Sequence, residues 1–275
     1  MYVIAEIGIN HNGDINLALD MMRYAKIVGA NCVKFQKRNP DICVPEEQKN
    51  QPRFWKNKEM TYLEYKWDIE FGKEEYDLIA ATAKEIGIDW TASVWDVDSL
   101  HFMEQYKHDI PFIKIPSACI TDFELLEAVK ASGMKIIMSG GMATAEMVLK
   151  AAVYLEPNII GLLHCNSSYP SNEGELDLNV IEAYHKKFPD LFIGYSSHDV
   201  SNFPCLLAAA AGAQIIERHF TTDTDLPGTD QKSSVNPIQM SELITQLERV
   251  NRIMGQSYPT FYVSEQIIAK KLRRV

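Results

Sequence analysis

Short runs of β-branched and other apolar residues alternate along the chain with longer segments whose apolar positions recur at helical spacing. The strand-like runs lie at residues 3–9, 31–36, 89–94, 111–115, 135–138, 158–163, 191–195 and 214–217. The helix-like segments lie at residues 16–28, 73–86, 98–106, 122–131, 146–155, 179–187, 202–211 and 238–253. Strands that alternate with helices predict a parallel sheet, and eight such units predict a (β/α)8 TIM barrel of the α/β class.

Residues at the ends of these segments support the same boundaries. Asp14 can cap the helix that begins beside it, and Gly87 and Gly133 stop the helices before them. An open, doubly wound sheet is the competing fold. It is disfavoured because no glycine-rich phosphate-binding fingerprint follows the first strand. The pattern therefore predicts one barrel over residues 1–253.

Two stretches fall outside the alternation. Residues 37–71 are polar and aromatic, with Pro40, Trp55 and Trp67 among them. A segment this long is either functional, as a lid or a wall beside the substrate, or a solvated insertion with one or two short helices. Residues 254–275 are predicted to be a polar arm or linker outside the barrel, with the basic end KKLRRV.

The composition is that of an ordinary soluble domain, with 46% apolar and 23% charged residues among 275. A formal net charge of −10 argues against nucleic acid and anionic membrane surfaces as partners, since both favour a basic face. The longest apolar run, CLLAAAAGA, is too short to span a bilayer. Five scattered cysteines without a C-x-x-C pair, and a first strand with no signal segment before it, predict a reduced, cytoplasmic protein.

Two histidines follow strands that are consecutive along the chain. His198 comes after the strand at 191–195, and His219 comes after the strand at 214–217. Because a strand, a crossover helix and a second strand place the strands side by side and parallel, both histidines are expected at one edge of the sheet. With carboxylates nearby, such a pair suits Mn²⁺, Fe²⁺ or Zn²⁺.

Polar residues also end the other strands, and in a barrel this is where active sites lie. They are Glu6, Lys34, Gln36, Ser93, Lys114, Ser117, Ser139, Ser167, Tyr169 and Ser196, with Asp230 beyond the last strand. Two lysines among serines offer positive charge and neutral donors, which suits a phosphate or a carboxylate. Glu6 could act as an acid–base or orienting group on a neutral polar substrate.

Each of these residues also has a purely structural explanation. A strand lysine such as Lys34 can pair with a buried carboxylate, and serines are ordinary turn residues. A single histidine in a loop is more often hydrogen-bonded than metal-bound. The functional interpretation therefore depends on the convergence of these groups at one end of one barrel.

The motifs at the strand ends resemble those of the sialic acid synthase family. They are AEIGINHNG at the first strand, VKFQ at the second, KIPS at the fourth, SGGM at the fifth, LLHCNSSYP at the sixth, GYSSH at the seventh and ERHFT with PGTD at the eighth. The resemblance keeps the motif order from residue 1 to about residue 250. It implies a barrel that condenses phosphoenolpyruvate with an N-acetylated hexosamine, uses Mn²⁺ or a similar metal, and releases phosphate.

The resemblance also implies a role for each matching residue. His198 and His219 would ligate the metal. Phosphoenolpyruvate contacts are implied for Lys34, Ser93, Lys114, Ser117, Ser139, Ser167 and Ser196. Sugar contacts are implied for Glu6, Gln36, Tyr169 and Asp230. Glu6, Lys34, Lys114 and His198 are the expected catalytic residues, and by analogy the protein is expected to be a homodimer.

Several positions depart from the family pattern. Cys119 stands where a glutamate contacts the sugar, and Ser197 stands where the seventh-strand motif has an aspartate. Ser93 replaces a threonine and Ser167 replaces an asparagine. The C-terminal antifreeze-like domain of family members, which reaches over the partner's site, is not in this sequence. The phosphoenolpyruvate half of the site is therefore expected to be kept and the sugar half to be altered.

The expected product is a 2-keto-3-deoxy sugar acid, formed when carbon 3 of phosphoenolpyruvate attacks the aldehyde of an open-chain sugar. Two alternatives stay open. One is a barrel aldolase that uses Lys34 or Lys114 as a Schiff-base lysine and needs no metal. The other is a non-catalytic barrel subunit that depends on a partner protein, in which Cys119 and Ser197 mark a decayed site.

Overall fold

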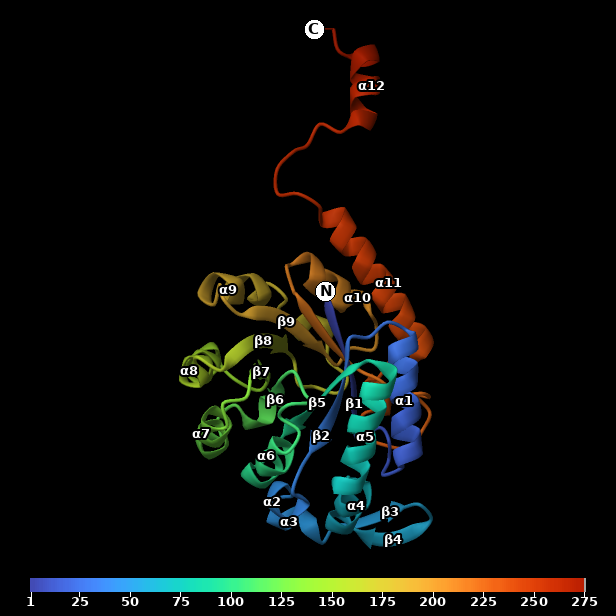
Figure 1. Ribbon diagram of the computed structural model, residues 1–275, viewed down its shortest axis with the longest axis vertical. Helices are drawn as coiled ribbons and strands as arrows, with labels where there is room; N and C mark the ends of the chain where they lie inside the picture. The colour runs from blue at the N-terminus through green and yellow to red at the C-terminus, as the bar shows by residue number, and fades with distance from the viewer. Residues whose placement is uncertain (275) are drawn as a thin grey trace.

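The computed structural model describes residues 1–274 and shows a closed barrel of eight parallel strands surrounded by helices (Figure 1). The strands are β1 (Tyr2–Gly8), β2 (Cys32–Lys37), β5 (Asp89–Val94), β6 (Ile113–Ile115), β7 (Ile136–Ser139), β8 (Ile159–Cys165), β9 (Phe192–Ser197) and β10 (Ile215–His219). Hydrogen bonds join them in the order β1-β10-β9-β8-β7-β6-β5-β2, and β2 pairs with β1. The predicted (β/α)8 fold is confirmed.

The outer layer consists of the helices that follow these strands. They are α1 (Ile15–Ile27), α5 (Lys73–Ile86), α6 (Val97–Glu104), α7 (Phe123–Ala131), α8 (Ala145–Leu155), α9 (Val180–Lys187), α10 (Phe203–Ala210) and α11 (Pro237–Met254). Buried helix residues such as Met21, Ile79 and Leu126 belong to one core cluster with the strand residues Val33 and Trp90. Burial of this apolar layer is the main force that holds the helices on the barrel. None of the helices within residues 1–274 has the length and apolarity needed to cross a membrane.

The helix ends follow the predicted chemistry. The Asp14 carboxylate accepts hydrogen bonds from the backbone N–H groups of Asn16 and Leu17 at the start of α1. Gly87 ends α5 in the left-handed region, at φ +68°, where a side chain would cost conformational energy. These two signals are local, which is why the sequence was sufficient to predict them.

Strands β9 and β10 extend further than the sequence predicted. Arg218 pairs with Ser197 in the β10–β9 ladder, and His219 pairs with Glu6 in the β1–β10 ladder. His219 is therefore the last residue of its strand rather than the first residue after it. Because side chains alternate along a strand, Arg218 points to the opposite face of the sheet from His219.

Residues 37–71 contain more regular structure than the predicted one or two short helices. They form α2 (Pro40–Cys43), α3 (Glu46–Lys49), the antiparallel pair β3 (Pro52–Trp55) and β4 (Lys58–Thr61), and α4 (Tyr62–Ile69). The hairpin turns through Asn57, whose φ is +62°, a conformation that asparagine tolerates better than most residues. Trp55 and Tyr65 share a small hydrophobic cluster with Ile9. The insertion therefore has its own core, which rests on the residues that follow β1.

The C-terminal residues form a helix that the sequence reading did not predict. Helix α12 (Val263–Leu272) lies apart from the barrel, at the end of the molecule opposite to β3 and β4 (Figure 1). Its apolar side chains, among them Val263, Ile267 and Leu272, are exposed. The expectation of a polar arm therefore missed both its helix and its apolar face, and Val275 lies outside the described residues.

Candidate active site

The residues that the sequence nominated lie together at the carboxyl ends of the barrel strands. A single pocket of about 60 Å³ is lined by Glu6, Lys34, Gln36, Ser93, Lys114, Ser117, Ser139, Ser167, Tyr169, Ser196, His198 and His219. Asp230 lies beside this pocket, with its Oδ2 atom 3.9 Å from Nδ1 of His219. The structure thus brings every nominated residue to one place, while their roles stay a prediction.

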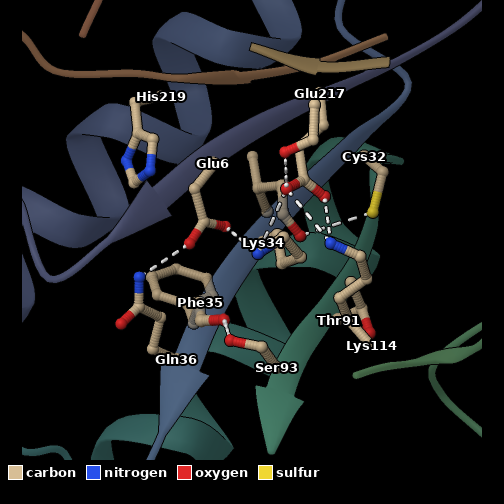
Figure 2. Close-up of polar contacts among 12 residues, drawn as sticks. Glu6, Cys32, Lys34, Phe35, Gln36, Thr91, Ser93, Lys114, Glu217 and His219 are labelled. Carbon is tan, nitrogen blue, oxygen red and sulfur yellow. Dashed lines mark hydrogen bonds and ion pairs between the residues drawn. The ribbon is translucent and has the colours of Figure 1, made fainter. Parts of the chain in front are cut away.

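Four buried charged side chains form the floor of the pocket (Figure 2). The Lys34 Nζ atom lies 2.7 Å from Oε2 of Glu6 and 3.7 Å from Oε1 of Glu217. The Lys114 Nζ atom lies 3.2 Å from both carboxylate oxygens of Glu217. Glu217 also accepts a hydrogen bond from the Ser196 hydroxyl, at 3.0 Å. Each lysine is therefore paired inside the barrel, and Glu217 bridges the two.

Glu217 is a member of the site that the sequence analysis missed. It stands two residues before His219 in the motif ERHFT. Because strand residues two apart share a face, a carboxylate at this position had to point to the same side as the histidine. The alternation within β10 was thus a usable signal. The partners of Glu217, on β2 and β6, could not be inferred from the same stretch of sequence.

The buried charges shift one another's ionisation. Burial opposes ionisation of Glu217, but Lys114 and Lys34 outweigh it and lower its pKa. Burial likewise opposes protonation of Lys34, but Glu217 and Glu6 together raise its pKa. Burial lowers the pKa of Lys114, and Glu217 offsets only part of this effect because Lys34 repels the Lys114 charge. Both lysines face Glu217, but only Lys34 also contacts a second carboxylate, that of Glu6. This difference explains why the pKa of Lys34 is raised and that of Lys114 is lowered.

A line of polar contacts leads from these charges towards the insertion. Gln36 Nε2 donates to Glu6 Oε1 at 3.0 Å, and Arg38 donates to Oε1 of Gln36. Glu6 lies between Lys34 and Gln36, with His219 close by (Figure 2). Burial raises the pKa of Glu6, although Lys34 opposes this. Glu6 is therefore the carboxyl group in the pocket best placed to hold a proton.

Hydroxyl and backbone donors line another wall of the pocket. The Ser117 hydroxyl accepts a hydrogen bond from the Gly141 N–H at 3.0 Å, and the Ser139 hydroxyl is buried without a partner. A Cβ atom at Gly141 would collide with the Ser167 hydroxyl. Glycine at this position therefore allows a close approach of backbone and hydroxyl groups. Such neutral donors suit the oxygen atoms of an anion.

The two histidines face one another across the pocket mouth, with ring centroids 5.4 Å apart. His198 Nδ1 lies 2.6 Å from the Asn166 carbonyl oxygen, and since a carbonyl only accepts, we assign the proton to Nδ1. This leaves Nε2 of His198 as the free donor atom. Burial lowers the pKa of His219 to about 3, so that ring is neutral, and its Nδ1 atom is buried without a hydrogen-bond partner. The Tyr169 ring lies over His198, with centroids 4.0 Å apart.

These features fit a divalent metal held by two protein ligands. No group of three or more His, Cys, Asp or Glu side chains within residues 1–274 is arranged to hold a metal ion. His198 and His219 nevertheless offer two imidazole nitrogen atoms, and burial keeps the His219 ring neutral. The Asn166 carbonyl fixes the orientation of the His198 ring, as the hydrogen-bond partners of metal-binding histidines commonly do. A metal at this position would keep several coordination sites open for water and substrate oxygens.

Ser197, which stands where the family pattern has an aspartate, is hydrogen-bonded to a neighbouring carboxylate, that of Asp199. The Ser197 hydroxyl lies 2.5 Å from Nη1 of the fully buried Arg218 and 2.6 Å from Oδ2 of Asp199. Tyr195 donates a further hydrogen bond to Asp199, at 2.8 Å. The family pattern predicts a carboxylate at the position of Ser197. In this chain the carboxylate belongs to Asp199, and the Ser197 hydroxyl joins it to Arg218. This network joins the ends of β9 and β10, and its residues Ser197 and Arg218 directly precede His198 and His219 in the chain.

Cys119, the other departure, is buried but is not among the residues that line the pocket. Its Sγ atom lies 3.6 Å from the Trp95 carbonyl oxygen. Burial raises its pKa to about 12, so it is a neutral thiol. The structure therefore places no charge at this position.

Comparisons with known proteins identify relatives of this chain. The model of the NeuB family matches residues 21–258. An N-acetylneuraminate-9-phosphate synthase from Mus musculus is 35% identical, over 98% of this chain and 76% of its own length. An N,N'-diacetyllegionaminic acid synthase from Campylobacter jejuni is 32% identical, over 96% of this chain and 80% of its own length.

Solved structures show the same fold. The crystal structure of N-acetylneuraminic acid (sialic acid) synthetase from Leptospira borgpetersenii, in complex with citrate, has a TM-score of 0.87 and 34% sequence identity, and the match covers 100% of this chain and 93% of that one. A truncated 3-deoxy-D-arabino-heptulosonate 7-phosphate synthase from Thermotoga maritima has a TM-score of 0.67 at 16% identity. The latter similarity shows the fold alone.

Proposed function

Because the chain belongs to the NeuB family, we propose that it is a transferase that condenses phosphoenolpyruvate with an aldose. The products would be a 2-keto-3-deoxy sugar acid of the sialic acid type and phosphate. The observation that supports this most directly is a single pocket lined both by two lysines that Glu217 bridges and by the pair His198 and His219. The synthase names of the relatives point to the same reaction type.

The two lysines are the proposed binding groups for phosphoenolpyruvate, which carries a carboxylate and a phosphate. Lys34 and Lys114 are both buried and both face Glu217, so their ammonium groups are held in place before an anion arrives. The surrounding hydroxyl groups would bind the remaining anion oxygens, and they belong to Ser93, Ser117, Ser139, Ser167 and Ser196. Preorganised donors of this kind stabilise charge without reorganising during the reaction.

In the proposed reaction, carbon 3 of phosphoenolpyruvate forms a bond to the aldehyde carbon, and the aldehyde oxygen gains a proton. Carbon 2 becomes cationic and takes up a water molecule, which loses a proton. The hydroxyl group of the resulting tetrahedral centre loses its proton as the C–O bond to phosphate breaks, which leaves a ketone, and the departing phosphate takes up that proton. Glu6 is the proposed acid–base group, since burial raises its pKa and it lies beside His219 (Figure 2).

A divalent metal, which we propose to be Mn²⁺, would bind His198 and His219. When bound, it would supply Lewis-acid polarisation at the sugar aldehyde oxygen. His219 is suited to this role because burial keeps its ring neutral and its Nδ1 atom has no hydrogen-bond partner. Gln36, Tyr169 and Asp230 are the proposed sugar contacts, since they surround the same two histidines and Glu6.

A Schiff-base aldolase is the second candidate, and one observation favours it. Burial lowers the pKa of Lys114, and a lysine that forms an imine needs a lowered pKa. The contacts of Lys114 with both Glu217 oxygens, at 3.2 Å, argue against it because they stabilise the protonated amine. Borohydride would trap a covalent adduct on Lys114 only if the aldolase mechanism operates.

The proposed function is tested by incubating the protein with phosphoenolpyruvate, Mn²⁺ and a panel of aldoses, with phosphate release and product mass as readouts. We expect metal-dependent phosphate release only when an acceptor sugar is present. His219→Ala should abolish it, and Lys114→Ala should weaken phosphoenolpyruvate binding far more than sugar binding. No turnover by the isolated chain with any acceptor would favour the partner-dependent subunit instead.

A further inference from the structure

Two of the five cysteines lie against the same backbone atom. The Cys43 Sγ atom is 3.8 Å from the Trp95 carbonyl oxygen, and the Cys119 Sγ atom is 3.6 Å from the same oxygen. The two sulfur atoms can therefore be no farther apart than about 7.4 Å, the sum of 3.8 and 3.6 Å. Within residues 1–274, no other two cysteine sulfurs share a hydrogen-bond partner.

The two cysteines belong to different parts of the molecule. Cys43 is the last residue of α2 in the insertion, whereas Cys119 is the last residue of the 3-10 helix η1 (Ser117–Cys119), which follows β6. Trp95, which both sulfurs contact, follows β5 and lines the active-site pocket. A bond between the two sulfurs would therefore join the insertion to the barrel beside a residue of the pocket wall.

Hydrogen bonds hold α2 in place on the barrel. The Asn39 N–H, at the start of α2, donates to Asp96 Oδ2 at 2.7 Å, and the Asn39 side-chain amide donates to Asp98 Oδ2 at 2.9 Å. Asp96 and Asp98 stand at the start of α6. Because α2 is a single helical turn, these bonds also fix the position of Cys43.

The two thiols differ in their exposure to water. Cys43 is half-buried, whereas Cys119 is buried, at 5% exposure. Cys32 and Cys205 are fully buried. An oxidant from solution therefore reaches Cys43 before these other thiols, and Cys119 is the nearby thiol that could react with the oxidised sulfur.

Asp96 supplies the proton acceptor that the oxidation of Cys43 needs. Burial, and next the hydrogen bond to Asp96, raise the pKa of Cys43, so its thiol is protonated at neutral pH. A thiolate is the nucleophile in such reactions, so the proton must leave as the sulfur attacks. The Cys43 Sγ atom lies 3.1 Å from Asp96 Oδ2, and the carboxylate is thus placed to take up that proton.

We propose that Cys43 and Cys119 form a peroxide-sensitive thiol pair that closes to a disulfide and locks the insertion onto the barrel. Rotation of the side chains to other staggered rotamers is the movement that brings the two sulfurs together. This inference goes beyond the proposed function and does not depend on it.

The oxidation takes place in two steps. The Cys43 sulfur first attacks one oxygen of hydrogen peroxide, the O–O bond breaks, and the Cys43 proton passes through Asp96 to the departing hydroxide, which leaves as water. The Cys119 sulfur then attacks the sulfur of the resulting Cys43 sulfenic acid. The S–O bond breaks, and the hydroxide leaves as water with the Cys119 proton. The two sulfurs together lose two electrons, and the peroxide is reduced to water.

The first test counts free thiols after oxidation of the full chain. The reduced protein is exposed to hydrogen peroxide, denatured and alkylated with iodoacetamide, and its mass is measured without reductant. We expect three alkylated cysteines rather than five, and a peptide map that joins Cys43 to Cys119. Cys43→Ser and Cys119→Ala should each keep all of their remaining thiols free. Cys205→Ala, which removes a buried cysteine outside the pair, is the matched control and should still form the disulfide.

Three results of this test would overturn the inference. Five alkylated cysteines after peroxide treatment would show that neither thiol of the pair reacts. Oxidation of Cys43 to the sulfinic acid while Cys119 stays free would show that the two sulfurs do not meet. A disulfide from Cys43 to any other cysteine would lead to the same conclusion.

A second measurement asks whether the disulfide forms within the folded structure. Because the bond closes a long loop between positions 43 and 119, it should raise the Tm of the wild type by several degrees, and dithiothreitol should reverse the rise. Cys43→Ser should have the same Tm before and after peroxide treatment. A Tm that does not rise in the disulfide-bonded wild type would show that the bond forms only in an opened state, and it would overturn the lock on the insertion.

Discussion

The barrel interior and the insertion treat positive charge in opposite ways. Inside the barrel, Lys34 and Lys114 are paired with carboxylates that also come from barrel strands. On the insertion, Arg53 and Lys66 lie over the ring of Tyr65 and have no carboxylate partner within residues 1–274. The interior lysines are thus balanced by carboxylates, whereas the two cations of the insertion are held against an aromatic ring. Removal of one interior carboxylate should therefore cost more stability than removal of a charge from the insertion.

The largest effect should follow from breaking the interior pairing. Glu217→Gln leaves Lys34 and Lys114 facing each other without their shared carboxylate, and we expect a loss of about 3–5 kcal/mol in the free energy of unfolding. Urea denaturation would measure it. The double variant Glu217→Gln with Lys114→Met is the control, and it should recover part of the loss. A loss below about 1 kcal/mol would show that the interior charges are not balanced through Glu217.

A smaller effect should follow from a change on the opposite face of β10 from Glu217 and His219, where Arg218 lies. Asp199→Asn weakens the bridge through Ser197 to Arg218. We expect a loss of about 1–3 kcal/mol in the free energy of unfolding. We also expect about a tenfold or larger loss of Mn²⁺ affinity, because Ser197 and Arg218 directly precede His198 and His219 in the chain and a shift of either strand end would move the rings. Titration of the metal by calorimetry would measure the second effect.

The matched control for that variant is Asp96→Asn. Asp96 is a buried carboxylate like Asp199, but it accepts hydrogen bonds from Asn39 and Ser99, away from the histidines. The Asp96→Asn variant should therefore have a lower free energy of unfolding and an unchanged Mn²⁺ affinity. Equal Mn²⁺ affinity in both variants and the wild type would limit Asp199 to a structural role.

The pH dependence of stability should distinguish the insertion from the interior. Lys66 has a pKa of about 8 in the folded protein and near its ordinary value of 10.5 when unfolded. Between these values the unfolded chain binds more protons, so this group makes stability rise with pH in that window. Lys66→Met should remove that rise, and it should raise stability at neutral pH, because the folded protein then no longer holds a charged group whose ionisation burial opposes. Urea midpoints of both proteins across this pH range provide the test, and identical pH profiles would contradict the lowered pKa.

The smallest effect should come from Lys58→Met, on the exposed side of the hairpin. We expect a change within about 0.5 kcal/mol in the free energy of unfolding, as for most surface substitutions. Thermal denaturation would measure it. A large effect would mean that the exposed part of the hairpin contributes to stability, contrary to the division between interior and insertion.

Much of the architecture could be predicted because its signals are local. The alternation of apolar runs and helical segments predicted the barrel, and the carboxyl ends of the strands then gave the residues that line the pocket. The insertion was harder, because its hairpin depends on a turn at Asn57 and on packing of Trp55 against Tyr65. Its apolar residues do not recur at the spacing of a helix or a strand, so the sequence did not predict these elements.

The sequence by itself determined the fold class and which side chains stand at the strand ends, since both follow from patterns within single segments. Only the tertiary structure decided which charges neutralise one another. Glu217 and Lys114 are 103 residues apart in the chain, yet they are hydrogen-bonded inside the barrel. The contacts of Asp199 likewise depend on the tertiary structure, because Ser197 joins it to Arg218 on the neighbouring strand. Ion pairing depends on distances across the barrel, and a one-dimensional pattern does not contain them.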